Sequence, residues 1–115
     1  MRRVMMNLEI KHIEKEGKQF LFLQGEIDVY TSETLKQSLL PLTAQEGNEV
    51  IVDFSDVNYI DSTGLGIFIG ALKSTHNHES SMKLTGMAER VRRLFKITGL
   101  DEIIDIEESE REEAK

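Results

Sequence analysis

Two adjacent hydroxyl side chains, Ser62 and Thr63, follow an acid, Asp61, and precede Gly64. An apolar run typical of a strand, residues 50–54, lies before them, and an apolar run with helical spacing lies after them. We therefore expect the hydroxyls at the start of a helix, where free backbone N–H groups and the helix dipole favour a phosphate or a carboxylate. Our interpretation is that Ser62 can be phosphorylated, with capping of the helix as the other role open to its hydroxyl.

Glycines follow the hydroxyl pair with a spacing that partly matches a dinucleotide-binding motif. The spacing Gly64-x-Gly66-x-x-x-Gly70 is close to the pattern, but that motif begins directly after its strand, and here residues 55–63 intervene. The acid expected about 20 residues further on is also missing, because Thr85 stands there. We interpret Gly66 and Gly70, one helical turn apart, as positions where the helix approaches a neighbour closely.

A serine nucleophile at Ser62 lacks the groups that would activate it. Ile60 stands where a nucleophile elbow needs glycine for its tight turn. His76 and His78 lie at the other end of the predicted helix and cannot reach back as a general base. The same two histidines, with Glu79, lack the further ligands that a tetrahedral metal site requires. We therefore predict no catalytic residue, no metal site and no cofactor, and a protein that is not an enzyme.

The composition of the chain excludes several classes of partner. Its 115 residues are typical of one domain, and its net charge of −7 argues against direct binding to nucleic acid. It has no cysteine, which suits a reducing compartment, and no apolar run approaches the ~20 residues that span a membrane. We expect a cytoplasmic protein that binds other proteins, without nucleic-acid or membrane contact.

The apolar pattern predicts five strands and three helices. We expect strands at residues 8–13, 20–23, 50–54, 81–85 and 103–106, and helices at residues 31–42, 65–76 and 91–98. The first two strands form an antiparallel hairpin, because a turn signal separates them. The later alternation of strands and helices indicates an α/β fold with a mixed, mostly parallel sheet. We place the domain at residues 1–106 and an acidic tail, solvated or disordered, at residues 107–115.

The last predicted helix has a basic face. It is formed by Arg90, Arg92, Arg93 and Lys96, with Glu89 as the acid opposing them. Two interpretations stay open at this point. The face is either a local docking patch for an acidic partner or an ordinary solvated helix surface.

Four segments of the chain resemble the bacterial anti-sigma factor antagonists, which are stand-alone STAS domains. They are residues 25–30 (GEIDVY), 50–54 (VIVDF), 59–66 (YIDSTGLG) and 93–100 (RLFKITGL). The similarity extends over nearly the whole chain as far as Ile106, and the Asp-Ser-Thr-Gly-Leu-Gly motif is a specific part of it. The resemblance implies a sheet of four or five strands, with three or four helices packed mainly on one side.

Partner switching is the function that this resemblance implies. In this family the unphosphorylated antagonist binds an anti-sigma factor that is also an ATP-dependent serine kinase, and this binding frees the sigma factor. The kinase then phosphorylates the antagonist, which dissociates, and a PP2C-type phosphatase resets the cycle. The chain would thus be a positive regulator of sigma-dependent transcription, as a monomer or weak dimer. The alternative functions are those of a STAS subunit in a lipid-transport complex or of a signalling scaffold.

The resemblance also implies roles for individual residues. Ser62 is the phosphoacceptor, and Asp28 and Asp61 are nearby acids that orient its hydroxyl or shape the docking face. The residues expected near the phosphorylation site or in contact with a partner are Asp28, Asp61, Thr63, Gly64, Leu65 and Gly66.

Overall fold

One mixed sheet carries the strands of the computed structural model, which describes residues 7–107. The strands are β1 (Leu8–Lys15), β2 (Lys18–Ile27), β3 (Glu49–Ile60), β4 (Ser81–Thr85) and β5 (Asp105–Glu107). The helices are α1 (Ser32–Thr43), α2 (Ser62–His78) and α3 (Glu89–Ile97), and a short 3-10 turn, η1 (Leu100–Glu102), follows α3. Among these described helices, none has the length and apolar character needed to cross a membrane.

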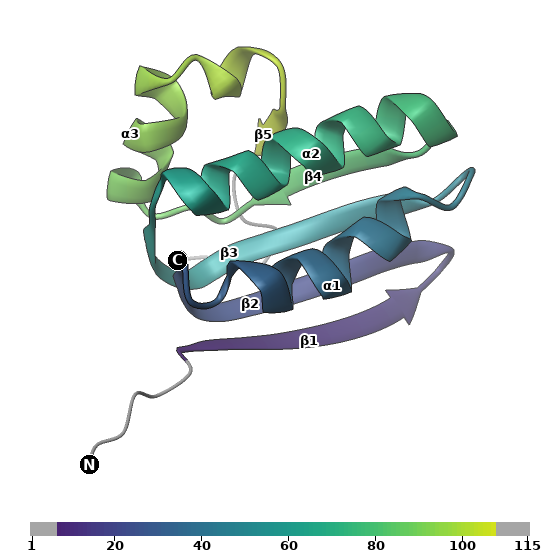
Figure 1. Cartoon of the computed structure of the whole chain (residues 1–115). Coiled ribbons are helices and arrows are strands. Elements are labelled where there is room, and N and C mark those ends of the chain that lie inside the picture. Colours follow the sequence, from purple (N-terminus) through teal and green to yellow (C-terminus); the bar gives the residue numbers. More distant parts are fainter. Residues whose placement is uncertain (1–6, 108–115) are drawn as a thin grey trace.

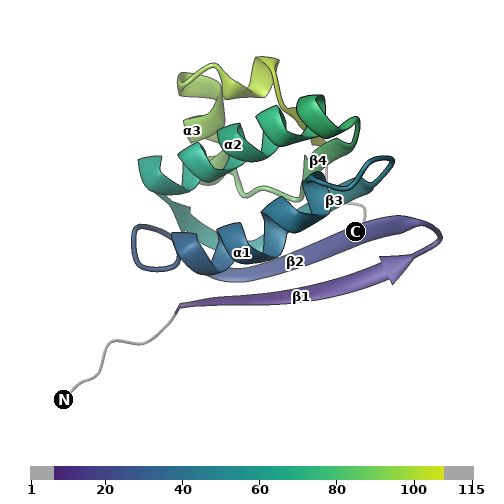
Figure 2. The ribbon, with the colours of Figure 1, turned by 45° about the vertical axis from the view of Figure 1, so that its right-hand side comes forward.

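The strands lie in the order β1-β2-β3-β4-β5, so each strand pairs with its neighbour in the sequence. β1 and β2 form an antiparallel hairpin, and β2 to β5 run parallel. Right-handed crossovers that all step in one direction place the connecting helices on the same face of the sheet. α1 and α2 lie side by side on that face, and α2 lies between α1 and α3 (Figures 1 and 2). The predicted fold class is confirmed.

Three phenylalanine rings join the sheet to two of the helices. Phe54 of β3, Phe68 of α2 and Phe95 of α3 are fully buried, and their ring centroids are separated by 5.3, 6.1 and 6.4 Å. Rings at such separations, in tilted and edge-to-face arrangements, attract one another beyond the effect of burying their area. The cluster therefore fixes α2 and α3 relative to β3, and with them the position where α2 begins.

Strand β3 is longer than the sequence pattern predicts. It continues past residue 54 as far as Ile60, and its last residue pairs with Ile27 of β2. The sequence pattern does not reveal this extension, because the residues after 54 are mostly polar and do not alternate regularly. Two register shifts in the pairing with β2 break the alternation of inward and outward side chains. Asp61 alone therefore connects β3 to α2, and this loop is much shorter than the sequence predicts.

Other element boundaries differ from the predicted ones by a few residues. The sequence predicts that Pro41 bends the first helix or ends it early, but α1 continues to Thr43, because a proline so close to the helix end removes an N–H group only from the last turn. Helix α2 ends at His78, slightly beyond the predicted end. Glu107, expected to begin the acidic tail, is the last residue of β5, and the rest of that tail, residues 108–115, lies outside the described residues.

Replacing Phe68 by alanine tests the aromatic cluster. We expect Phe68→Ala to lower the free energy of unfolding by about 3–5 kcal/mol, because it removes the ring contacts and leaves a cavity. Urea unfolding followed by circular dichroism measures this loss. The control Ile97→Ala shortens a side chain that is 71% exposed and should change the value by less than about 0.5 kcal/mol. Equal losses in the two variants would contradict the role of the cluster.

Candidate functional site

Ser62 is the first residue of α2 and directly follows the connecting residue Asp61. The Asp61 backbone is extended, and its Oδ1 accepts a hydrogen bond of 3.1 Å from the N–H of Gly64, so Asp61 caps the helix. Ser62 and Thr63 are exposed, and within residues 7–107 neither hydroxyl takes part in a hydrogen bond. Capping of α2 by Ser62 is therefore wrong, and the Ser62 hydroxyl is open to solvent.

The turn that contains Asp28 lies next to this helix start. Ile27 of β2 pairs with Ile60 of β3, so the residues that follow them, Asp28 and Asp61, begin neighbouring loops. The Asp61 N–H donates a hydrogen bond of 3.1 Å to the carbonyl oxygen of Ile27 and ties the two loops together. The carboxyl ends of two parallel strands thus bring together the acids that the sequence singled out.

Asp28 organises its own turn. Its Oδ1 accepts hydrogen bonds from the backbone N–H groups of Tyr30 and Thr31, at 2.9 and 3.1 Å. The buried Thr31 hydroxyl donates to the carbonyl oxygen of Glu26 and accepts from the N–H of Asp28, both at 2.9 Å. Such side-chain bonds to the backbone stabilise a turn, so Asp28 fixes the shape of the loop that lies beside the start of α2.

Gly64 allows α2 to approach the sheet closely. A Cβ atom at this position would lie 2.6 Å from Cγ2 of Ile27 and 2.8 Å from Cγ1 of Ile60, well inside contact distance. A Cβ atom at Gly66 or Gly70 would meet nothing within 4 Å, so the predicted close approach at those two glycines is wrong. The small residue is needed at the helix start, because the ends of the two central strands lie against it.

The site residues expected in α2 divide into a buried and an exposed group. Gly64 and Leu65 are buried, and Leu65 belongs to the hydrophobic core. Ser62, Thr63 and Gly66 are exposed. The buried pair therefore supports the helix start, while the exposed residues form the surface that a partner can reach.

Three large apolar side chains are exposed, two in the turn after β2 and one next to the last residue of β3. Their exposed fractions are 60% for Val29, 78% for Tyr30 and 48% for Tyr59. The sequence reasoning missed them as site residues. The available signal was a pair of large apolar residues, Val29 and Tyr30, in a connection between a strand and a helix. Val29 and Tyr30 are adjacent in the chain, and exposed apolar side chains that lie together mark protein-binding surfaces.

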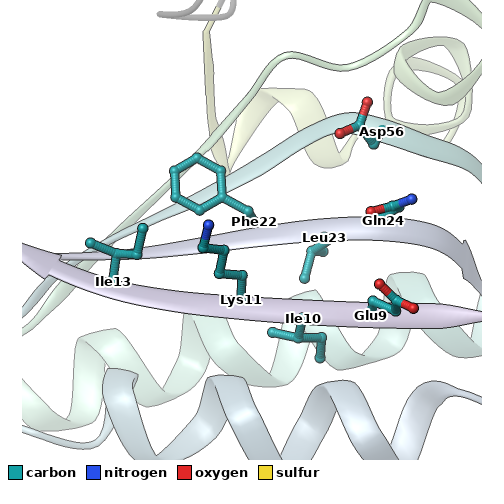
Figure 3. A pocket seen from close by; sticks show the side chains of 8 residues that line it. All are labelled: Glu9, Ile10, Lys11, Ile13, Phe22, Leu23, Gln24 and Asp56. Carbon is teal, nitrogen blue, oxygen red and sulfur yellow. The ribbon is translucent and has the colours of Figure 1, made fainter.

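Within residues 7–107, the two histidines considered as a base for Ser62 lie far from it along α2. His76 and His78 lie in the last turn of α2, at the other end of the helix. The described part of the chain contains no cluster of three His, Asp or Glu side chains that would hold a metal ion. A hollow of about 390 Å³ lies elsewhere, on the sheet face away from the helices, where Phe22 and Lys11 project (Figure 3). The exposed Ser62 side chain is therefore suited to contact with the surface of another protein.

Comparison with known proteins assigns the family. The model of the STAS domain matches residues 9–113. The chain belongs to the STAS domain family. It is 42% identical over 108 residues to the anti-sigma-B factor antagonist of Listeria monocytogenes, which covers 93% of this chain and 95% of that protein. Such relatives are named as regulators and not as enzymes.

Two solved structures share the fold. An anti-sigma factor antagonist from Mycobacterium paratuberculosis matches with a TM-score of 0.78 and 22% identity, over 87% of this chain and 85% of that chain. The Bacillus cell fate determinant SpoIIAA in its phosphorylated form matches with a TM-score of 0.67 and 16% identity, over 90% of this chain and 92% of that chain. At these identities the likeness supports the fold alone.

Alanine substitutions at Gly64 and Gly66 should change stability in opposite directions. We expect Gly66→Ala to raise the free energy of unfolding by about 0.5–1 kcal/mol, because alanine favours the helix and its Cβ meets open space. We expect Gly64→Ala to lower it by about 1–3 kcal/mol, because its Cβ overlaps Ile27 and Ile60. Urea unfolding of both variants measures the difference. Stabilisation by both substitutions would show that Gly64 is not a close contact.

Proposed function

We propose that this protein is an anti-sigma factor antagonist that changes partners through phosphorylation of Ser62. The unmodified form binds an anti-sigma factor that is also an ATP-dependent serine kinase, and the sigma factor is released. Phosphorylation ends this binding, and a PP2C-type phosphatase restores the unmodified form. The names of its relatives support the role of antagonist. The exposed Ser62 hydroxyl in the first turn of α2, without a hydrogen-bond partner among the described residues, supports the site.

The start of α2 can accept a phosphate without loss of the fold. Ser62 and Thr63 occupy the first two helical positions, whose N–H groups have no acceptor within the helix. These groups and the positive end of the helix dipole offset part of the added charge of about −1.5 to −2. Because Asp61 caps the helix, modification of the Ser62 hydroxyl removes no hydrogen bond between described residues. The phosphorylated chain is therefore expected to keep its structure.

A phosphate on Ser62 changes the docking surface instead. Asp28 and Asp61 stand at the start of neighbouring loops, so the added charge makes this surface strongly acidic. A kinase that holds ATP brings further phosphates and acidic groups to the same place. Like charges juxtaposed at an interface cost several kcal/mol, and about 1.4 kcal/mol is a tenfold loss of affinity. A change at one side chain can therefore reverse the choice of partner.

Val29, Tyr30 and Tyr59 supply apolar contact at this surface. Tyrosine is among the residues that carry the largest share of binding energy at protein interfaces. The Tyr30 side chain is 78% exposed, while its backbone N–H is held by Asp28, so docking orders little additional backbone. We assign these three side chains as apolar anchors for the kinase in the unphosphorylated complex.

Two substitutions of Ser62 test the switch. Ser62→Ala should bind the kinase as the unmodified protein does, but ATP should not release it, because no phosphate can be added. Ser62→Asp should bind at least about tenfold more weakly, because it places a negative charge at the helix start. Calorimetry with the kinase, with and without ATP, measures both affinities.

Equal, tight binding by the two variants would rule out the switch. Phosphopeptide mapping after incubation of the unmodified protein with kinase and ATP identifies the modified residue. Phosphate on Thr63 or Ser55 instead of Ser62 would refute the assignment of the site.

Truncation of Tyr30 tests the apolar anchors. We expect Tyr30→Ala to weaken binding of the kinase by about 2 kcal/mol or more, roughly 30-fold, because an exposed aromatic anchor is lost. The control Ile13→Ala shortens a side chain on β1 that is 37% exposed and lies outside the Ser62 surface. Calorimetry of both variants gives the comparison. A loss of similar size for Ile13→Ala would assign the kinase to a different face.

A further inference from the structure

Helix α3 is locally basic in an acidic chain. The net charge of the chain is −7, yet the nine residues of α3 include four basic side chains and one acid. They are Arg90, Arg92, Arg93, Lys96 and Glu89. This concentration of positive charge makes α3 the element most unlike the rest of the chain in its electrostatics.

The buried face of α3 directs the basic side chains outward. Val91 and Phe95 are fully buried in the core, and the four basic side chains are exposed. Within residues 7–107, Arg90 and Lys96 form no ion pair. Arg93 lies 3.7 Å from Glu89, but both side chains are more than half exposed, and such surface pairs are weak. The charges of Arg90, Arg93 and Lys96 are therefore available to a partner.

A hollow of about 370 Å³ lies between α3 and the turn that follows it. It is lined by Arg92, Arg93 and Lys96, together with Glu89 and Asp101. The hollow is thus mainly cationic, with an acid from each of the two elements. An extended segment of another chain can lie in it with carboxylates against Arg93 and Lys96.

Two exposed isoleucines accompany the residues of this hollow. Ile97 is 71% exposed and follows Lys96, and Ile103 is 59% exposed and lies just after η1. Exposed apolar side chains beside polar ones are typical of a protein-binding surface. The partner must therefore offer apolar side chains as well as carboxylates.

We infer that α3 and η1 form a second docking surface, which binds an acidic segment of a partner protein that also carries apolar side chains. Nucleic acid fits this surface less well, because the net charge of −7 repels a polyanion, and Glu89 and Asp101 would face its phosphates. A peptide can instead place backbone N–H groups opposite these two acids. The two isoleucines have apolar partners in a peptide and none on a phosphate backbone.

This surface shares no residue with the one around Ser62. The Ser62 surface is built by the start of α2 and the turn after β2, whereas the hollow belongs to α3 and η1. Helix α2 lies between α1 and α3, and α3 occupies one side of the helical layer (Figure 2). The inference therefore goes beyond the proposed switch and stands or falls independently of it.

Titration of the full chain with a defined peptide tests the inference. The probe is a synthetic peptide of sequence Glu-Leu-Glu-Glu-Leu-Glu-Glu-Leu, compared with the peptide in which every Glu is Gln. Backbone amide NMR shifts should change at Arg93, Lys96, Ile97 and Ile103, and the Gln peptide should bind at least about tenfold more weakly. Raising the salt concentration from about 0.05 M to about 0.5 M should weaken binding, because exposed charges are screened.

A matched pair of double variants assigns the binding to α3. The double variant Arg93→Glu with Lys96→Glu should bind the acidic peptide at least about tenfold more weakly. Lys36→Glu with Lys73→Glu changes the net charge by the same amount at exposed positions of α1 and α2, and should leave binding unchanged. All four side chains are exposed, and the amide spectrum of each variant reports whether the fold is retained.

Three outcomes would overturn the inference. The first is an absence of localised shifts up to millimolar peptide. The second is equal weakening by the two double variants, which would make the effect one of net charge alone. The third is tighter binding of single-stranded oligothymidylate than of the acidic peptide at the same residues, which would assign the surface to nucleic acid.

Discussion

The parallel pairing of β2 with β3, carried to the last residue of both strands, is the constraint on which the candidate site depends. It places Ile27 beside Ile60, and the Asp61 N–H then binds the carbonyl oxygen of Ile27 at 3.1 Å. The same two isoleucine side chains leave room only for glycine at position 64. The edge of the sheet thereby fixes where α2 begins, and with it the position of the Ser62 hydroxyl.

The two acids at this edge of the sheet stabilise different parts of the site. Asp61 caps α2, and Asp28 holds the turn that presents Tyr30. Neither task needs the Ser62 hydroxyl, which is exposed and takes no part in the hydrogen bonds of residues 7–107. A serine in this position can gain a charge without disturbing a cap or a turn. The proposed switch therefore acts through the charge of a surface and needs no change of fold.

The sequence predicts the class of fold well, because the order of strands and helices and the right-handed crossovers leave few arrangements. It predicts the site less completely, because three features depend on contacts between distant segments. The extension of β3 to Ile60 follows from irregular pairing with β2. The close contact at Gly64, and not at Gly66, follows from where two strand ends lie. The exposure of Tyr30 depends on what the rest of the chain leaves uncovered, which the apolar pair Val29 and Tyr30 signals only in part.

In the proposed switch, a phosphate on Ser62 weakens docking through surface charge while the fold stays the same. The most direct measurement is calorimetric titration of the proposed kinase with the chain fully phosphorylated on Ser62, beside the unmodified chain. The phosphorylated chain should bind at least about tenfold more weakly, since about 1.4 kcal/mol of repulsion suffices. Backbone amide shifts should change only around the turn after β2 and the start of α2. An undiminished affinity of the phosphorylated chain for the kinase, or amide shift changes throughout the sheet, would contradict the proposed switch.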